Sequence, residues 1–268
     1  MSELRPLLSD AAPLRPLLQQ RPFGILSDID GTLSAIAPRP EEAYVPDSVR
    51  ELLAKLSEAG VRIGLITGRP LAEAQRRVGL ETAAYAGNHG LEMAFDSKAE
   101  SAPGAAKYFG QAQAVIAYFE KLPLPGVRIE NKGPIVALHY RQSPDPDASR
   151  KAILAAVAAT PPAGAFRLHE GKKIVELRPP LPVSKGTAAE TMVRRLGLRS
   201  VIALGDDMTD VDMFEAVGRL RDEGRIQGAR IAVEAAETPQ AVFAAADYRV
   251  EGVEGVERLL VSLLKELA

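Results

Sequence analysis

Two aspartates two residues apart, Asp28 and Asp30, follow a short apolar run in the stretch FGILSDIDGT. Gly31 comes next, and glycine accepts backbone angles that other residues resist, so we expect a turn that lets both acids face one substrate. A carboxylate beside a metal can attack phosphorus and become an aspartyl-phosphate, while its neighbour donates and accepts protons. Taken alone, an Asp-x-Asp-Gly run is also typical of a turn or a helix cap.

Three further stretches carry groups that suit the same chemistry. Thr67, in ITGR, offers a hydroxyl and a backbone N–H to phosphate oxygens, and Lys185, in VSKG, supplies a cation for developing charge. Asp206, in GDDMTD, is a hard oxygen ligand of the kind that Mg²⁺ prefers. Each stretch alone has a plain structural interpretation as a turn, a helix start or a cap. The four together, in this order, are a more specific pattern and indicate phosphoryl transfer.

The segments around these stretches alternate between strand and helix. We expect strands at 23–28, 61–67, 200–207, 230–233 and 247–250, a strand with a hairpin within 83–95, and helices at 47–59, 70–78, 210–217, 239–245, 252–266 and after Ser184. This alternation predicts an α/β fold with a doubly wound parallel sheet covered by helices. Ligands of such sheets bind outside the carboxyl ends of the strands, so all four stretches are expected to meet in one crevice.

Residues 101–180 have a different pattern. Helices are expected near 105–121 and 146–159, and hairpins are expected to turn at 132–134 and at Gly171. Strands paired by tight turns predict a smaller α+β domain, an antiparallel sheet with helices on one face, inserted into a core made of 1–100 and 181–268. Prolines 179, 180 and 182 are expected at the exit hinge, and the proline-punctuated first twenty residues are expected to form an arm without an assigned function.

Composition excludes several classes of function. Of the 268 residues 46% are hydrophobic and 25% charged, which are ordinary globular values, and a net charge of -2 gives no general field for nucleic acid or an anionic membrane. No cysteine is present, so disulfides, thiolate catalysis and cysteine metal sites are excluded, and the three histidines lie far apart. Without an apolar run of about 20 residues or a basic-then-apolar leader, a soluble cytoplasmic protein is expected. The oligomeric state is left open.

The four stretches resemble the four ordered motifs of the haloacid dehalogenase superfamily: Asp28-Ile29-Asp30-Gly31-Thr32, Thr67-Gly68-Arg69, Lys185 and Gly205-Asp206-Asp207. The resemblance implies that Asp28 is the nucleophile and a magnesium ligand. Asp30 would then be the acid and base, lending its backbone carbonyl to the metal. The implied sets are the catalytic residues Asp28, Asp30, Thr67 and Lys185, the Mg²⁺ ligands Asp28, Asp30 and Asp206, and the supporting acids Asp207 and Asp210.

The inserted segment carries charges on a small, otherwise apolar unit. Strand alternation places Glu176 and Arg178 on one face, opposite Val175 and Leu177. Carboxylates accept hydroxyl hydrogen bonds and cations bind phosphate oxygens, which suits a sugar phosphate. Solvated charges on the open face of a small sheet explain the same pattern without a ligand.

A second resemblance extends over roughly residues 24 to 215. The stretches GNHGLE, NKGPIVALHYR, KIVELRPPLPVSKG and LGDDMTDVDMF together resemble trehalose-6-phosphate phosphatases. This implies that the disaccharide is contacted by Glu130, Lys132 and Glu176, and by one of Lys172 and Lys173. Arg141, Asn88 and His89 would flank the phosphate. Gly68 and Arg69 are also expected to bind substrate. His89 is alternatively a hydrogen-bonded turn histidine, and His139 is expected to be packed in a strand.

The leading hypothesis is a Mg²⁺-dependent phosphatase that converts trehalose 6-phosphate to trehalose and phosphate through an aspartyl-phosphate. One alternative is the same chemistry on another sugar phosphate, such as sucrose phosphate or mannosyl-phosphoglycerate. Another is a sugar-phosphate sensor without catalysis. A signalling receiver domain is disfavoured, because receivers are about half this length, lack an inserted domain and need no acid at the position of Asp30.

Overall fold

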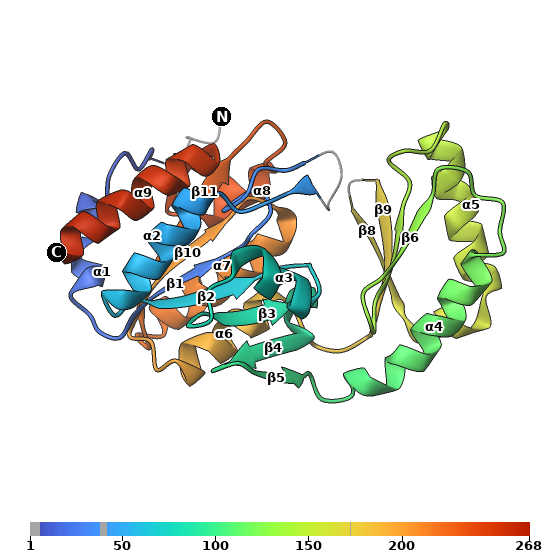
Figure 1. Cartoon of the computed structure of the whole chain (residues 1–268), viewed down its shortest axis with the longest axis horizontal. Coiled ribbons are helices and arrows are strands. Elements are labelled where there is room, and N and C mark those ends of the chain that lie inside the picture. The colour runs from blue at the N-terminus through green and yellow to red at the C-terminus, as the bar shows by residue number, and fades with distance from the viewer. Residues whose placement is uncertain (1–5, 38–41, 172) are drawn as a thin grey trace. The chain divides into compact units, whose positions relative to one another are not determined.

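The computed structural model describes residues 6–37, 42–171 and 173–268. The chain forms two compact units (Figure 1). Met1–Glu100 and Val183–Ala268 make the first, here called the core unit, and Ser101–Pro182 make the second, here called the inserted unit. The inserted unit thus ends two residues beyond the segment 101–180 that the sequence pattern separates from the core.

An eight-stranded sheet lies at the centre of the core unit. Its strands, in spatial order, are β12 (Tyr248–Glu251), β11 (Gln227–Glu234), β10 (Ser200–Gly205), β1 (Phe23–Ser27), β2 (Arg62–Ile66), β3 (Ala84–Gly87), β4 (Glu92–Phe95) and β5 (Lys98–Ser101). The pairings from β12 to β3 are all parallel, and β4 runs antiparallel to β3. Strands β2 to β5 follow one another on one side of β1, and β10 to β12 follow one another on its other side. The predicted doubly wound parallel sheet is therefore confirmed.

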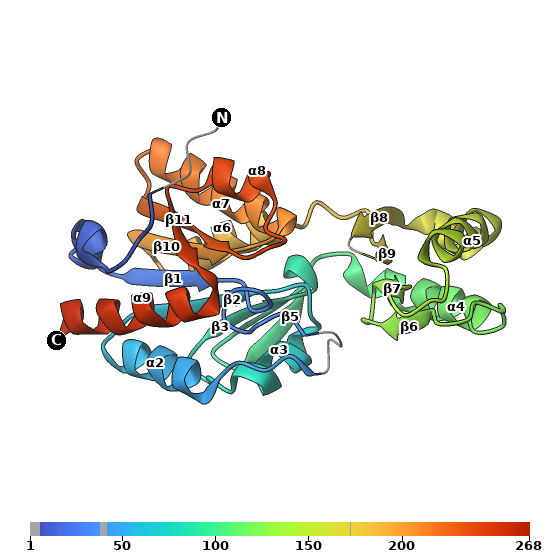
Figure 2. The ribbon, with the colours of Figure 1, turned by 90° about the horizontal axis from the view of Figure 1, so that it is seen from above.

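Helices cover both faces of this sheet (Figure 2). One face packs against α1 (Arg15–Leu18), α2 (Asp47–Glu58), α3 (Leu71–Val78) and α9 (Gly252–Leu267), and the other against α6 (Lys185–Arg195), α7 (Met208–Asp222) and α8 (Gln240–Ala245). Because both faces are covered, every residue of β1 and β10 is buried, which explains why these strands read as unbroken small and apolar runs. Of the helices that the structure describes, none has both the length and the apolar character needed to cross a membrane.

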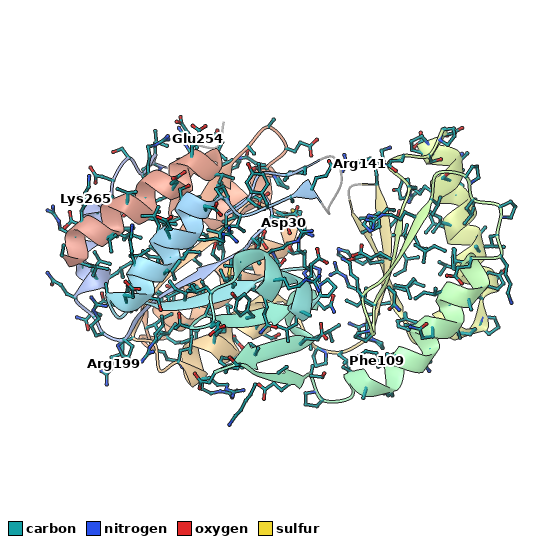
Figure 3. The ribbon with its side chains drawn as sticks, in the orientation of Figure 1. Asp30, Phe109, Arg141, Arg199, Glu254 and Lys265 are labelled. Atoms are coloured by element: carbon teal, nitrogen blue, oxygen red, sulfur yellow. The ribbon has the colours of Figure 1, made fainter. Side chains whose placement is uncertain are left out.

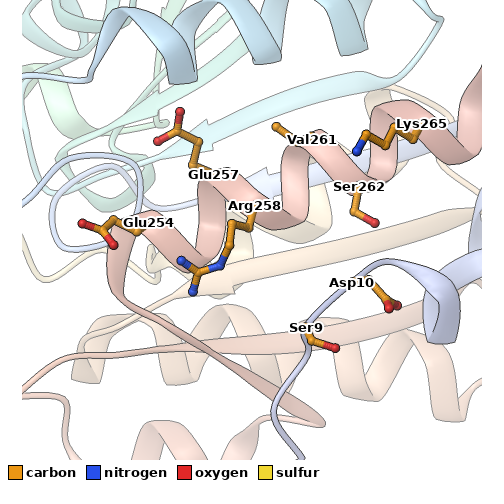
Figure 4. Close-up of a pocket in the computed structure, with 8 residues that line it drawn as sticks. All are labelled: Ser9, Asp10, Glu254, Glu257, Arg258, Val261, Ser262 and Lys265. Atoms are coloured by element: carbon orange, nitrogen blue, oxygen red, sulfur yellow. The ribbon is translucent and has the colours of Figure 1, made fainter.

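The N-terminal arm packs on α9. Leu8, Leu14 and Leu18 are buried in the core, and the short turn η1 (Ala12–Leu14) leads into α1. The backbone N–H of Ala11 donates to Ser262 Oγ at 2.9 Å. A groove of about 500 Å³ separates the arm from α9 (Figure 4). It is lined by Ser9, Asp10, Glu254, Glu257, Arg258, Val261, Ser262 and Lys265. These residues carry both signs of charge and include no candidate catalytic group, so we assign the groove no function.

The inserted unit contains a four-stranded antiparallel sheet. Its strands, in spatial order, are β6 (Arg128–Asn131), β7 (Val136–His139), β9 (Ile174–Arg178) and β8 (Arg167–Gly171). The helices α4 (Tyr108–Phe119) and α5 (Pro146–Ala159), with the turns η4 (Ala105–Lys107) and η5 (Pro161–Ala165), complete this unit. Val136, Leu138, Val175 and Leu177 form one apolar face with residues of α4 and α5. The other side is called the helix-free face below.

Some element ends differ from the prediction. The helix expected at 105–121 begins as a 3₁₀ turn and becomes α-helical only at Tyr108. The helix expected at 210–217 runs from Met208 to Asp222, because the Asp210 side chain accepts from backbone N–H groups at its start. Strand β8 includes Gly171, and the chain turns after it, with Lys173 in the left-handed region at φ 60°.

Candidate active site

The four predicted stretches meet at the carboxyl edge of the core sheet. Asp28 directly follows β1, and its N–H donates to Leu204 O of the neighbouring strand β10 at 3.0 Å. Asp206 directly follows β10, and Thr67 directly follows β2. Lys185 is the first residue of α6, whose start is capped by the Ser184 side chain. Neighbouring parallel strands therefore deliver these groups to one place, as expected for a doubly wound sheet.

A buried cluster of charges forms there. Lys185 Nζ lies 2.7 Å from Asp28 Oδ1 and 2.8 Å from Asp210 Oδ1. Asp206 Oδ1 accepts a hydrogen bond from Thr32 Oγ1 at 3.1 Å. Asp28 is 4% exposed, Lys185 3% and Asp210 0%. Charges this deeply buried are stable only when they are paired and hydrogen-bonded.

Asp210 lies inside the cluster, although the sequence suggested only a supporting position. Its Oδ2 accepts from the backbone N–H groups of Asp206 and Asp207, both at 3.0 Å, and its Oδ1 accepts from Lys185. A Cβ on Gly205 would lie 2.4 Å from Asp210 Cγ, so only glycine fits before this turn. Asp210 thus fixes the loop that presents Asp206.

The cluster carries more negative than positive charge. Burial raises the pKa of Asp28, and although Lys185 lowers it, Asp210 and Asp206 raise it further, so it ends well above its usual value. Burial and Asp210 likewise raise the pKa of Asp206 to about 7. Despite burial, Asp210 and Asp28 raise the pKa of Lys185 above its usual value. One ammonium therefore leaves part of the carboxylate charge unneutralised.

A divalent cation fits this excess charge. Asp28, Asp206 and Asp210 each offer a carboxylate oxygen, and these atoms lie within 4.8 Å of one another. Carboxylate oxygens are the ligands that Mg²⁺ prefers, and a bound cation would favour the ionised carboxylates. The donor set of this edge thus suits magnesium, with Asp210 as a candidate ligand that the sequence pattern had not placed in the metal set.

Asp30 is bound by an arginine. Arg69 Nε lies 2.6 Å from Asp30 Oδ2, and Arg69 Nη2 lies 2.6 Å from Asp30 Oδ1, a two-pronged pair. Arg69 was assigned to substrate binding from the sequence, and the structure places it against the proposed acid and base. Gly31 has φ 88°, and a Cβ there would lie 2.2 Å from Asp206 Oδ2. Glycine is therefore required both by the backbone angle and by the close approach of Asp206.

The remaining predicted residues of the core unit surround the Thr67 turn. Thr67 Oγ1 accepts from Arg69 N at 3.2 Å, and His89 N donates to Thr67 O at 2.9 Å. Asn88 and His89 both have positive φ in the short turn η3 (Asn88–Gly90). A Cβ on Gly68 would lie 2.8 Å from His89 Cε1, so the imidazole packs directly over this glycine. Gly68, Arg69, Asn88 and His89 are thus brought together around Thr67.

In the inserted unit, three predicted residues lie in two contacts on the helix-free face. Lys132 Nζ lies 3.0 Å from Glu176 Oε1. Glu130 Oε2 lies 2.6 Å from His139 Nε2, so His139 is not merely packed in its strand. Arg178, two residues after Glu176, also binds that carboxylate.

The other predicted residues of this unit are less enclosed. Arg141 is exposed just after β7 (Figure 3, which also labels Asp30 of the core unit). Lys173 Nζ lies 4.0 Å from Asp147 Oδ1, a carboxylate that is itself exposed. Lys172 lies outside the described residues.

Several residues that contact the predicted site were missing from it, among them Thr32 and His139. Thr32 donates to Asp206, and the only sequence signal for this is its place directly after Gly31. His139 contacts Glu130, nine residues away in sequence, and nothing in the local pattern indicates that pairing.

The fold is shared with a haloacid dehalogenase-like hydrolase of Bacteroides thetaiotaomicron, which superposes with a TM-score of 0.56 at 16% identity and covers 87% of this chain and 96% of the other. The family model described as trehalose-phosphatase matches residues 26–253. The chain belongs to the trehalose-phosphatase family.

Similar curated proteins include one that is named a trehalose-phosphate phosphatase. The chain is 36% identical over 214 residues to an uncharacterized glycosyl hydrolase of Mycobacterium tuberculosis, a match that covers 76% of this chain and 16% of that protein. It is 33% identical over 227 residues to a trehalose-phosphate phosphatase of Mycobacterium bovis, covering 81% of this chain and 57% of that one. The chain thus spans less than two thirds of the length of these relatives.

The fold itself is shared with the C-terminal domain of a C. albicans trehalose-6-phosphate phosphatase. That structure superposes with a TM-score of 0.77 at 24% identity, covering 98% of this chain and 99% of the other.

Proposed function

We propose that this chain is a Mg²⁺-dependent phosphatase that hydrolyses trehalose 6-phosphate to trehalose and phosphate. The observation that carries the proposal is the buried cluster in which Lys185 contacts Asp28 beside Asp206, at the edge where a doubly wound sheet binds ligands. Family membership and the names of the relatives support the choice of substrate.

In the first step, a carboxylate oxygen of Asp28 attacks phosphorus. The bond between phosphorus and the sugar oxygen breaks, and Asp30 gives that oxygen its proton, so trehalose leaves as the neutral alcohol. Lys185, held 2.7 Å from Asp28, favours the ionised form of the nucleophile and balances charge on the transferring phosphoryl group. Thr67 contributes its hydroxyl to the phosphoryl oxygens. Its backbone N–H, expected from the sequence to be a second donor, instead donates to Ala86 O of β3 at 2.9 Å.

In the second step, water attacks the phosphorus of the aspartyl-phosphate. Asp30, ionised after the first step, takes a proton from this water, and the bond between phosphorus and Asp28 breaks to release phosphate. The bidentate contact from Arg69 orients the ionised Asp30 carboxylate for this second transfer.

The residues proposed to hold Mg²⁺ are Asp28 and Asp206, with the backbone carbonyl of Asp30 and the neighbouring Asp210 carboxylate. When bound, the ion neutralises phosphate charge that would otherwise be repelled by the aspartates. The sugar is proposed to be bound by Glu130, Lys132 and Glu176 of the inserted unit, together with the more exposed Lys173. Arg141, with Asn88 and His89, is proposed to flank the phosphate.

The test is a panel of phosphate esters assayed for released phosphate. We expect the highest kcat/KM for trehalose 6-phosphate, loss of activity with a chelator, and recovery with added Mg²⁺. A preference for sucrose phosphate or mannosyl-phosphoglycerate would replace the substrate and keep the chemistry. No turnover on any ester, together with binding of a sugar phosphate, would instead favour a non-catalytic sensor.

A further inference from the structure

The helix-free face of the inserted unit holds its two carboxylates in different ways. The register pairs Glu130 with Ala137 and Ala137 with Glu176, so both carboxylates lie on the same side of the sheet. Val136 and Leu138, which alternate with Ala137, pack into the apolar core of the unit. Both acids are therefore presented on the side that α4 and α5 do not cover.

Glu176 has both of its oxygens engaged. Oε1 accepts from Lys132 Nζ at 3.0 Å, and Oε2 accepts from Arg178 Nε at 2.8 Å. Glu176 itself is only 4% exposed. Two cations on a carboxylate this enclosed make Glu176 an anchor that fixes the Lys132 ammonium.

Glu130 is held by one oxygen only. Its Oε2 lies 2.6 Å from His139 Nε2 and 3.9 Å from Arg128 Nη2. Among the residues that the structure describes, no donor is assigned to its Oε1. A carboxylate oxygen has room for about two hydrogen bonds, so this atom keeps its accepting capacity for a ligand.

The pairing also defines the proton on the histidine. Burial alone would raise the pKa of Glu130, but the His139 hydrogen bond and the charges of Lys132, His139 and Arg128 lower it below the usual value. Glu130 is therefore an ionised acceptor, and His139 Nε2 must carry the hydrogen that lies between them.

We propose that His139 is a positioning residue for sugar recognition, which holds Glu130 through Oε2 so that Oε1 accepts a hydrogen bond from a sugar hydroxyl. The inference rests on the proposed function. It divides the two acids by role: Glu130 accepts from the sugar, and Glu176 orients Lys132. His139 contacts no substrate atom itself, and its effect passes entirely through Glu130.

The test compares His139→Ala with His139→Gln on trehalose 6-phosphate and on a small aryl phosphate, which has no sugar hydroxyls. The amide nitrogen of glutamine stands the same number of bonds from Cβ as His139 Nε2, so it restores the donor. We expect His139→Ala to lower kcat/KM for the sugar phosphate about 10-fold to 100-fold. On the aryl phosphate we expect a loss below about threefold, and we expect His139→Gln to recover most of the sugar-phosphate activity.

A double-mutant comparison separates positioning from folding. In a Glu130→Ala background, His139→Ala should cause no further loss on the sugar phosphate, because the residue through which it acts is gone. The matched control is Arg150→Ala, which breaks the exposed contact with Glu170 in the same unit and should leave the ratio of the two activities unchanged.

Two kinds of result can overturn the proposal, and they are distinguishable. If the unsubstituted protein turns over trehalose 6-phosphate and His139→Ala matches it, loses both activities equally, or adds its full effect to Glu130→Ala, the positioning role is wrong while the function stands. If the unsubstituted protein does not turn over trehalose 6-phosphate but dephosphorylates the aryl ester, the proposed substrate fails, and the inference fails with it.

Discussion

At the scale of single residues, Lys185 is a buried cation between two buried carboxylates of the core unit. Its Nζ lies 2.7 Å from Asp28 Oδ1 and 2.8 Å from Asp210 Oδ1, and all three side chains are buried. Removing one partner of a buried ion pair is costlier than the pair is stabilising, because the remaining charge is left without compensation. Removal of this one charge should therefore lower the free energy of unfolding strongly.

We predict that Lys185→Met lowers the free energy of unfolding by about 3 to 5 kcal/mol at neutral pH. Added Mg²⁺ should recover part of this loss, because an ion that binds only the folded cluster stabilises it. Urea unfolding with and without Mg²⁺ measures both effects. Lys55→Met is the matched control, since Lys55 is exposed and lies 3.8 Å from the exposed Glu51. An equal effect of the two substitutions would contradict the role of Lys185.

Most contacts between individual side chains could not be predicted from the sequence. The residue types at Asp28, Thr67 and Asp206 predicted one site, because strand ends bring them together. The contact of Arg69 with Asp30 spans 39 residues, and that of His139 with Glu130 depends on the register of β6 and β7. Such pairings follow from rotamers and register, which a single sequence does not specify.

At the scale of elements, one carboxylate ties three segments of the core sheet together. Asp247 lies just before β12, and its carboxylate accepts three hydrogen bonds from Arg230 of β11. The donors are Arg230 N at 2.9 Å, Nε at 2.9 Å and Nη2 at 2.6 Å. Arg221 of α7 adds a contact at 3.1 Å. Burial would raise the pKa of Asp247, but the hydrogen bonds from Arg230 and Arg221 outweigh it and lower the pKa.

The depressed pKa gives a pH-dependent stability. A carboxyl that titrates below its usual value of 3.8 contributes stability above that pH and loses it as the pH falls through the folded-state value. We predict that Asp247→Asn lowers the free energy of unfolding by about 2 kcal/mol at pH 7. The difference from the parent should narrow as the pH is lowered toward about 2.

Urea unfolding across that pH range measures the effect. Asp222→Asn is the matched control, because Asp222 is exposed and contacts only the neighbouring Arg221 at 3.2 Å among the described residues. A deficit for Asp247→Asn that stays constant with pH would show that the charge is not its cause.

The elements themselves were more predictable than their ends. The strands β1, β2 and β10 are almost entirely small and apolar because both sheet faces are covered, and Arg62 at the start of β2 is their one exposed residue. This pattern allowed the strands to be assigned from the sequence. Helix α7 begins at Met208, before the expected residue 210, because Asp210 is the third helical residue of a local capping box whose N-cap is Asp207.

At the scale of the whole molecule, phosphoryl transfer and sugar binding are proposed to belong to different units of the chain. Apart from Arg141, which is expected to flank the phosphate, every residue assigned to the phosphoryl chemistry lies in the core unit, and the carboxylates and cations assigned to the sugar lie in the inserted unit. The switch from strand–helix alternation to hairpins predicted a separate inserted segment from the sequence, and the roles assigned to the two units stay a proposal. The identity of the sugar is not encoded in that pattern, and it rests on the family to which the chain belongs.

The central claim is that the Asp28 carboxylate attacks phosphorus, and Asp28→Asn tests it most directly. The amide keeps the shape of the side chain but cannot form the aspartyl-phosphate, so we predict that phosphate release from trehalose 6-phosphate falls by on the order of 10³-fold or more. Urea unfolding should show an intact cooperative fold, and Asp222→Asn should retain full turnover. Phosphate release by Asp28→Asn within about tenfold of the parent would contradict the account.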